Sequence, residues 1–413
     1  MKKIQNAIVA PKGFKANAVH SGIKRRRYDL SLIYSETACA GAAVYTRNIV
    51  KAAPLLVTKE IIEKNSDLRA VVINSGNANA CTGKQGLEDA KSMVKEVECA
   101  LGLPADSVLV ASTGVIGVPL PMDRIKKGIT EVVKNLEATQ EAAGRAVDGI
   151  MTTDLRKKGV AYEFELNGKT VKIGAIAKGS GMIHPNMGTM LGFITTDCAI
   201  SNEMLQKALS ETTENTYNML SVDGDTSTND MVVLLANGLA DNNEINCENE
   251  DYIKFKEVLE KINVYLAKQI VMDGEGATKF LEAEVIGGKT PEDAKKLAKT
   301  IISSTLVKTA FFGEDANWGR VLAAMGRSGG EFSPEKVKIE FIAGKNDKWE
   351  DPKPILLMEN GTPVPFEEEH AREVLERKFI KIKITLEDGD ATATAWGCDL
   401  SYEYVRINGE YRT

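Results

Sequence analysis

Histidine and closely spaced cysteines are what this sequence has least of. Its 413 residues include only 3 histidines and 6 cysteines, and the cysteines are scattered without the paired spacing of a zinc site or a redox pair. A histidine-rich metal centre is therefore not expected, and a catalytic triad built on histidine has few candidates.

Long apolar runs and nucleotide motifs are absent as well. No segment reaches the roughly 18 apolar residues that a membrane span requires, and the first residues lack a signal-peptide core, so we expect a cytoplasmic protein. The formal net charge of −6 argues against nucleic acid as the main partner. Because no Walker or dinucleotide glycine pattern occurs, we expect no cofactor.

Three aspartates raise the question of a metal site. Asp223, Asp225 and Asp230 alternate with glycine and small hydroxyl residues, which could suggest calcium or magnesium. The segment lacks the twelve-residue loop ending in glutamate that a calcium hand needs. We therefore expect these carboxylates to serve loop structure and hydrogen bonding, with no metal bound.

The most informative segment that is present runs from residue 178 to 197 and reads KGSGMIHPNMGTMLGFITTD. It places Gly188-Thr189 between a turn-rich approach and an apolar run. Cleavage at this bond would give Thr189 a free α-amine, whose reference pKa of about 7.7 to 8.0 lets it act as base for the hydroxyl of the same residue. The ordinary alternative is a helix start that contains a glycine, and spacing alone favours it. We interpret His184, which lies close by, as a structural or substrate-edge residue, because the amine suffices as the base.

Strand and helix patterns alternate along most of the chain, which predicts a mixed α/β fold. Two alternating runs around Asn167-Gly168 predict a β-hairpin whose second strand leads to Lys178. After Gly330 the pattern is typical of a smaller α+β unit, and residues 380–397 predict a second hairpin. The other expected strands cover 68–76, 107–112, 231–238, 281–288 and 337–344, and the expected helices cover 86–102, 122–136, 202–218, 252–272, a segment opening at 290–293, and 367–378.

Further motifs extend over the chain in a fixed order: NSGNANACTG (74–83), ASTGVIG (111–117), MTTD (151–154), SVDGDTSTND (221–230), MDGEGATKF (272–280), FFGEDANWGRVLAAMGRSG (311–329) and a tail ending in NGEYRT. Together with residues 178–197 they closely resemble the ornithine acetyltransferase family, the ArgJ proteins of arginine biosynthesis. The resemblance spans nearly the whole chain, from Gly13-Phe14 to Thr413.

The resemblance implies an αββα layered sandwich that cleaves itself into residues 1–188 and 189–413. In this division, residues 189 to about 285 complete the sandwich and about 286–400 form the smaller α+β unit. Residues 401–413 form a tail that folds back over the site. Without the resemblance, a tail this polar would be expected to fray.

The family's site residues fall on matching positions of this sequence. The resemblance implies Thr189 as nucleophile, with Gly188-Thr189 as the cleavage site, and Thr113 and Gly114 as the oxyanion hole. It implies substrate contacts by Thr152, Lys178, Thr189, Glu275, Asn408 and Thr413. Thr153 could take the place of its neighbour Thr152. Gly188 stands where the family more often has alanine, and cleavage stays feasible because both residues are small.

The implied activity is acetyl transfer from N2-acetylornithine to glutamate through an acetyl-threonine intermediate, with ping-pong kinetics. Some members of the family also accept acetyl-coenzyme A, and the sequence leaves that point open. The family further implies an α2β2 heterotetramer of the cleaved halves. Two rivals stay open here: an amidohydrolase or aminopeptidase with the same terminal threonine, and an uncleaved binding protein.

Overall fold

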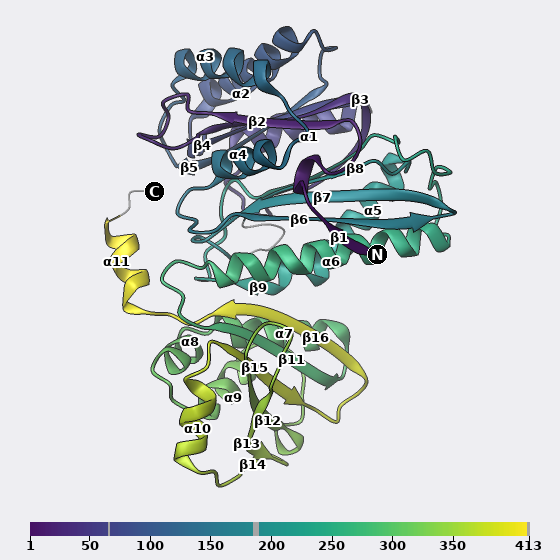
Figure 1. The fold of residues 1–413 in the computed structure, drawn as a ribbon. Helices are drawn as coiled ribbons and strands as arrows, with labels where there is room; N and C mark the ends of the chain where they lie inside the picture. The colour runs from purple at the N-terminus through teal and green to yellow at the C-terminus, as the bar shows by residue number, and fades with distance from the viewer. Residues whose placement is uncertain (65–66, 185–189, 411–413) are drawn as a thin grey trace.

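The computed structural model of the protein describes residues 1–64, 67–184 and 190–410 (Figure 1). Gly188, Thr189 and Thr413, to which the resemblance assigns the cleavage site, the nucleophile and a substrate contact, lie outside these described residues. The described part forms two β-sheets with helices on them and between them.

The first sheet has the strand order β1-β6-β7-β8-β10-β3-β4-β5, with β2 paired to β3. Strand β3 joins the two parts of this sheet, because residues 30–35 pair with β2 and residues 40–45 pair with β10. The strands are β1 (Lys2–Ile4), β2 (Phe14–Val19), β3 (Leu30–Tyr45), β4 (Leu68–Asn77), β5 (Val108–Val115), β6 (Lys158–Leu166), β7 (Lys169–Lys178), β8 (Leu191–Thr196) and β10 (Met231–Ala236).

The second sheet has the order β14-β13-β12-β15-β11-β16-β9. Its strands are β9 (Leu220–Ser221), β11 (Phe280–Gly288), β12 (Lys338–Gly344), β13 (Lys353–Glu359), β14 (Thr362–Pro363), β15 (Phe379–Thr385) and β16 (Ala391–Cys398). Residue 285, taken as an approximate boundary of the smaller unit, lies inside β11, and the whole of that strand belongs to the second sheet.

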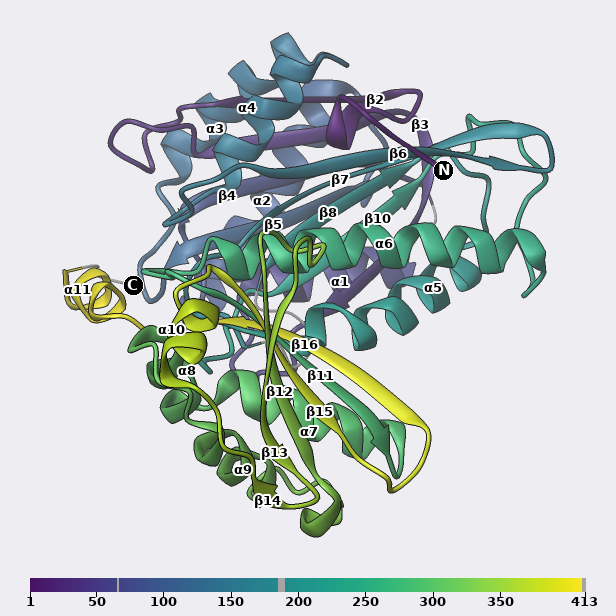
Figure 2. The same ribbon diagram turned by 60° about the horizontal axis from the view of Figure 1, so that its bottom comes forward.

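The helices occupy three layers. Helices α1 to α4 pack on β2 to β5, α6 packs on β6 and β7 and also on β16, and α7 packs on β11 and β16. Figures 1 and 2 show α6 running between the two sheets. The helices are α1 (Ala53–Lys64), α2 (Gly83–Leu101), α3 (Met122–Val132), α4 (Gln140–Ile150), α5 (Asn202–Asn215), α6 (Glu250–Met272), α7 (Pro291–Ser303), α8 (Thr305–Phe312), α9 (Trp318–Gly326), α10 (Glu368–Leu375) and α11 (Tyr402–Glu410), with short 3₁₀ turns at Ala7–Val9, Val133–Asn135, Tyr217–Met219 and Pro334–Lys336.

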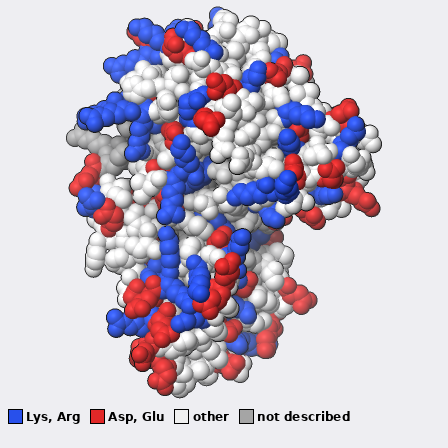
Figure 3. Space-filling model, in the orientation of Figure 1, with Lys and Arg blue, Asp and Glu red and all other residues white. Residues whose placement is uncertain are grey.

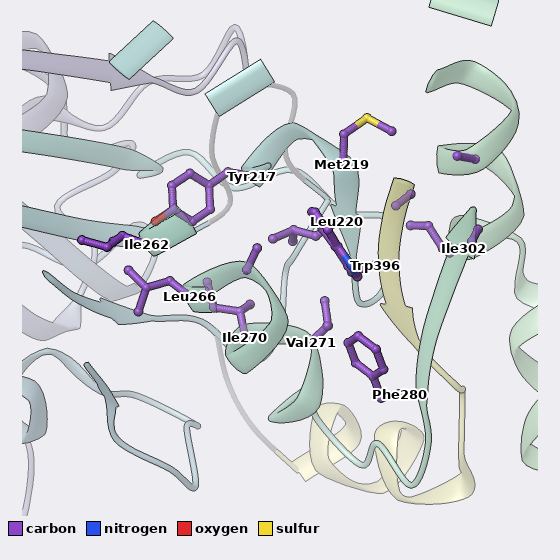
Figure 4. Close-up of a cluster of buried hydrophobic side chains, with 14 of the residues drawn as sticks. Tyr217, Met219, Leu220, Ile262, Leu266, Ile270, Val271, Phe280, Ile302 and Trp396 are labelled. Atoms are coloured by element: carbon purple, nitrogen blue, oxygen red, sulfur yellow. The ribbon is translucent and has the colours of Figure 1, made fainter. Parts of the chain in front are cut away.

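Helix α6 joins the cores of the two sheets. It begins where the Asn249 side chain accepts a hydrogen bond from the backbone N–H of Tyr252 at 2.9 Å, an N-cap that satisfies a free helix donor. Its apolar side chains then recur three or four residues apart, as a buried helix requires. These fully buried residues are Phe255, Leu259, Ile262, Leu266 and Ile270. Figure 4 shows part of this stripe beside Phe280 and Trp396 of the second sheet.

The predicted hairpin around Asn167-Gly168 is confirmed. Strands β6 and β7 pair antiparallel in unbroken register from Lys158↔Ala177 to Leu166↔Lys169. Both turn residues have positive φ, 47° at Asn167 and 76° at Gly168, as a tight two-residue hairpin turn needs. The hairpin therefore delivers Lys178 to the end of β7.

The second predicted hairpin, over residues 380–397, is wrong. Strand β11 lies between β15 and β16, parallel to the first and antiparallel to the second. The connection crosses β11 at Gly287, whose carbonyl accepts from Asp388 and Gly389 at 3.0 Å. Gly287 has φ +79°, and a Cβ on it would lie 2.0 Å from the Leu386 carbonyl oxygen, so a glycine is required at this crossing. Pairing with a distant strand overrides the local turn signal.

The mixed α/β fold predicted from the sequence and the sandwich implied by the family resemblance are confirmed: helices cover the first sheet, and a smaller sheet unit lies toward the C-terminus. Basic and acidic side chains are interspersed over the face drawn in Figure 3. Among the helices of the described residues, none has the combined length and apolarity needed to cross a membrane.

Candidate active site

A pocket opens where the ends of β5 and β7 meet the loop before β10 and the helix α11. Its volume of about 270 Å³ is close to the lower end, about 300 Å³, of the range for small-molecule sites. Its lining includes Thr113, Gly114, Thr152, Lys178, Glu275 and Asn408. The structure therefore brings together every predicted site residue that it describes, from segments far apart in the sequence.

Gly114 stands where only glycine fits. Its φ is +133°, and a Cβ on it would lie 2.3 Å from the carbonyl carbon of Gly76 and 2.4 Å from the nitrogen of Asn77. The neighbouring strands β4 and β5 run parallel and come together at this point. The register between β4 and β5 shifts at this point, where Thr113 and Gly114 bring backbone and a hydroxyl to the pocket. This geometry suits an oxyanion hole. That role stays a prediction.

Asn229, in the loop before β10, bonds to the backbone near the ends of β4 and β5. Its side-chain amide donates to the carbonyls of Ala78, at 2.6 Å, and Ser112, at 2.9 Å. Asn229 is buried and lines the pocket. Sequence reasoning missed it, because its partners lie more than a hundred residues away along the chain.

Lys178 is buried, although an isolated lysine at a strand end would ordinarily be exposed. Its residue is 8% exposed, and its backbone pairs with Leu191 at the start of β8. Within the described residues it has no ion pair within 4.0 Å. A buried ammonium without a close counter-ion can bind an anionic ligand group such as a carboxylate.

Glu275 connects the loop after α6 with the C-terminal helix. Its Oε2 accepts from Asn408 Nδ2 at 2.8 Å, and its backbone N–H donates to the Ser180 carbonyl at 3.1 Å. A Cβ on Gly181 would lie 2.3 Å from Glu275 Oε2, so a larger residue there would displace this carboxylate. Helix α11 therefore brings Asn408 to the pocket, as the tail prediction requires.

Thr152 and Thr153 both line the pocket. The backbone N–H of Thr152 donates to Asp154 Oδ2 at 3.0 Å, which orders the loop after α4. Since both threonines lie at the pocket, the choice between them as substrate ligand stays open.

The loop after β9 and the start of β10 bind the described residues on either side of the predicted cleavage site. Asp223 accepts hydrogen bonds from the backbone N–H groups of Met182, at 2.6 Å, and Ile183, at 2.8 Å. On the far side of the predicted cut, Met231 N–H donates to the Met190 carbonyl at 3.0 Å. Asp223 thus serves loop structure by binding the backbone of residues 182 and 183. Among the described residues, no group of acids, histidines or cysteines is arranged to hold a metal.

Asp230, which the sequence predicts to serve the structure of this loop, is also a pocket residue. It is 3% exposed, it lines the pocket, and its Oδ2 has no hydrogen-bond partner among the residues that the structure describes. Burial raises the pKa of this carboxyl well above its usual range, although a hydrogen bond with Ser227 and the charge of Lys178 oppose the shift. The pocket therefore contains a buried carboxyl group that favours its neutral form.

His184 is bonded to the end of β9 and to the loop that follows it. Its Nδ1 lies 3.0 Å from Ser221 Oγ, and its carbonyl accepts from Thr226 Oγ1 at 2.7 Å. Burial, with a smaller contribution from the charge of Lys299, lowers the pKa of His184 to about 4. It is not among the described residues that line the pocket, which agrees with a structural role.

Fold and pocket together define a mixed α/β protein whose pocket has about the size of an amino acid and is lined by charged and hydroxyl side chains. The family model for the ArgJ family matches residues 15–413. A relative from Caldanaerobacter subterraneus subsp. tengcongensis, named arginine biosynthesis bifunctional protein ArgJ, is 49% identical over 100% of both chains. A relative with the same name from Thermotoga neapolitana is 48% identical over 98% of this chain and 99% of its own.

The structure of ornithine acetyltransferase from Mycobacterium tuberculosis, complexed with ornithine, is 40% identical to this chain. The match covers 45% of this chain and 98% of that one, with a TM-score of 0.42. From the family model and the full-length relatives, the chain belongs to the ArgJ family.

Proposed function

We propose that this chain transfers an acetyl group from N2-acetylornithine to glutamate, in the cyclic route of arginine biosynthesis. The observation that carries the proposal is the meeting of Thr113, Gly114, Thr152, Lys178, Glu275 and Asn408 around one pocket, in a member of the ArgJ family. The pocket has the size and the mixed charge that a zwitterionic amino acid requires.

The first step is cleavage at Gly188-Thr189. The Thr189 hydroxyl oxygen attacks the Gly188 carbonyl carbon, the peptide C–N bond breaks, and the acyl group passes to the hydroxyl as an ester. Water then hydrolyses the ester, which leaves a carboxylate on Gly188 and a free hydroxyl and α-amine on Thr189. The backbone bonds that hold residues 182, 183 and 190 support this step, because they fix the chain on both sides of the bond.

The second step uses the same hydroxyl on the substrate. The α-amine of Thr189 takes the hydroxyl proton, the oxygen attacks the acetyl carbonyl, and ornithine leaves with the proton on its amine. Glutamate's amine then attacks the acetyl ester and regenerates Thr189. Thr113 and Gly114 would stabilise the negative oxygen that develops in both half-reactions, which is usually the largest single contribution to catalysis.

Substrate recognition divides between opposite charges. Lys178 would bind the α-carboxylate that acetylornithine and glutamate share, and Glu275, steadied by Asn408, would bind an ammonium group of ornithine. Thr152 and Thr413 would complete the contacts. Acetyl-coenzyme A would serve as a second donor only if the pocket mouth admits it, and a donor assay decides that point. The scheme needs no cofactor.

A denaturing gel with intact-mass measurement tests the first step. We expect fragments of residues 1–188 and 189–413, assembled as an α2β2 heterotetramer in native mass measurements. A single uncleaved chain would favour the binding-protein alternative and overturn the proposal.

A product assay with acetylornithine, with and without glutamate, tests the second step. We expect N-acetylglutamate to form only when both substrates are present, with parallel lines in a double-reciprocal plot. Acetate release that is unaffected by glutamate would identify the amidohydrolase alternative instead.

A further inference from the structure

A buried ion-pair triad lies behind the pocket. Lys158 Nζ donates to Asp154 Oδ1 at 2.7 Å and to Asp273 Oδ2 at 2.5 Å. The three side chains are at most 2% exposed. None of them is among the described residues that line the pocket, so the triad acts on a ligand only through other residues.

Asp154 connects the triad to two of the predicted substrate ligands. Its Oδ2 accepts from the backbone N–H of Thr152 at 3.0 Å. Its Oδ1 accepts from the backbone N–H of Gly179, directly after Lys178, at 2.7 Å. One carboxylate therefore fixes the backbone beside Thr152 and beside Lys178.

Asp273 connects the triad to the third predicted ligand. Its Oδ2 accepts from the backbone N–H groups of Leu155, at 3.1 Å, and Arg156, at 3.2 Å. Its carbonyl accepts from Ser180 Oγ at 2.6 Å, and the Ser180 carbonyl accepts from the Glu275 N–H at 3.1 Å. The loop of Thr152, the end of β7 and the loop of Glu275 are thus bonded to one charged centre.

The triad also interacts electrostatically with Lys178, which lines the pocket. Burial acts to raise the pKa of Asp154, but the charges of Lys158 and Lys178 outweigh it and lower this pKa well below its usual range. Lys178, Asp154, Lys158 and Asp273 therefore form a series of alternating sign. A buried ion pair adds little net stability compared with apolar side chains of the same volume, so placement of its neighbours is the better account of this arrangement.

We propose that the Asp154–Lys158–Asp273 triad is a positioning device that sets Thr152, Lys178 and Glu275 in one mutual geometry for substrate binding. Its members are positioning residues rather than catalytic residues. The identity of the substrate rests on the proposed function, whereas the mechanical coupling of the three segments does not.

The test compares variants of the triad with a matched control. Asp273→Asn keeps the side-chain shape and removes one charge. The double variant Lys158→Met/Asp273→Asn removes one charge of each sign, so the net charge of the triad stays unchanged, and it serves as the second variant if the single one folds poorly. The control is Lys157→Met, because Lys157 is next in sequence but pairs with the surface residue Asp148, at 2.6 Å, outside the triad.

In the folded, cleaved variants we expect KM for both amino-acid substrates to rise by about 10-fold to 100-fold, as when a residue that orients ligands is lost. We expect kcat at saturation to change by less than about 3-fold, and Lys157→Met to match the wild type. A merely structural role would lower the unfolding temperature and the active fraction and leave KM unchanged. Unchanged KM in a folded triad variant would overturn the proposal.

Hydrogen exchange provides a readout that does not depend on activity. We expect faster amide exchange in the triad variants at residues 152–156, 178–181 and 274–276 together, and wild-type exchange in the control. Faster exchange in one segment alone would overturn the coupling. If the exchange result holds while the wild type transfers no acetyl to glutamate, the proposed function fails and the positioning role stands.

Discussion

The pocket side of the first sheet and the central strands of the second sheet differ in how their buried and half-buried charges are paired. In the second sheet Lys381 pairs with Glu282 and Glu284, each at 3.2 Å, and Glu282 also pairs with Lys268 and accepts from the Trp396 indole. Each of these charges has a partner. At the pocket, Asp230 Oδ2 has no partner and Lys178 has no ion pair within the described residues.

We infer that the paired groups of the second sheet stabilise the fold, whereas Lys178 and Asp230 are available to a ligand. A buried polar group without a partner costs free energy, so it persists where a bound molecule or a chemical step uses it. The same sequence signal, a lysine on a β-strand, therefore has opposite meanings at Lys178 and Lys381. The following predictions test whether the two regions are separate in function.

Thr189→Ala should have the largest effect. One hydroxyl performs the attack in both cleavage and transfer, so we expect a single uncleaved chain and no measurable N-acetylglutamate. Mass measurement and the product assay check the two losses separately. Thr189→Ser, which keeps the hydroxyl, is the control and should still cleave. A cleaved alanine variant would contradict the scheme.

Thr113→Ala should lower kcat by about 10²-fold to 10³-fold, the usual result of losing one oxyanion donor. Cleavage should slow as well, because it passes through a similar oxyanion. Steady-state kinetics and a time course of processing measure both. If the folded variant keeps the wild-type rate, Thr113 has no part in the oxyanion hole.

Lys178→Met and Lys381→Met form a direct test of the comparison. Loss of Lys178 should raise KM for acetylornithine and for glutamate together, by about 10-fold to 100-fold, the value of a hydrogen bond to a charged group. Loss of Lys381 should lower the unfolding temperature and leave both KM values unchanged. A rise confined to one substrate would indicate two separate carboxylate subsites.

The motifs and the family resemblance that they carry were sufficient to predict the class of the fold and part of the pocket lining, namely Thr113, Gly114, Thr152, Lys178, Glu275 and Asn408. They could not predict the second sheet's strand order, because LEDGD looks like a local turn and the strand between its flanks comes a hundred residues earlier. They also could not reveal the triad. Lys158 and Asp273 lie 115 residues apart, and neither has a local pattern that indicates a buried charge.

Asp230→Asn and Glu282→Gln should change stability in opposite directions. The pKa of Asp230 is raised in the folded state. Its contribution to the free energy of unfolding is therefore present at low pH and is lost as pH rises through that folded-state value. At pH 8 the asparagine should therefore raise the unfolding temperature, and by more than at pH 5. Glu282→Gln should lower it, because Lys268 and Lys381 lose their shared partner. Thermal unfolding at both pH values measures the pair, and a destabilised Asp230→Asn at pH 8 would mean that the folded protein needs the carboxylate.

His184→Asn should have the smallest effect at neutral pH, and its effect on acid stability has a defined sign. The folded-state pKa of His184 is about 4, below the unfolded reference of about 6.5. Protonation therefore favours the unfolded chain, and stability is lost as pH falls from about 6.5 toward the folded value. The asparagine variant should lose less of its unfolding temperature between pH 7 and pH 4.5 than the wild type. Transfer activity should rise with pH as the Thr189 α-amine, the proposed base, loses its proton. This rising limb of the pH–rate profile should stay in place in the variant. If that limb disappears while cleavage still occurs, the imidazole is the base, and the separation of structural from ligand-facing groups fails at His184.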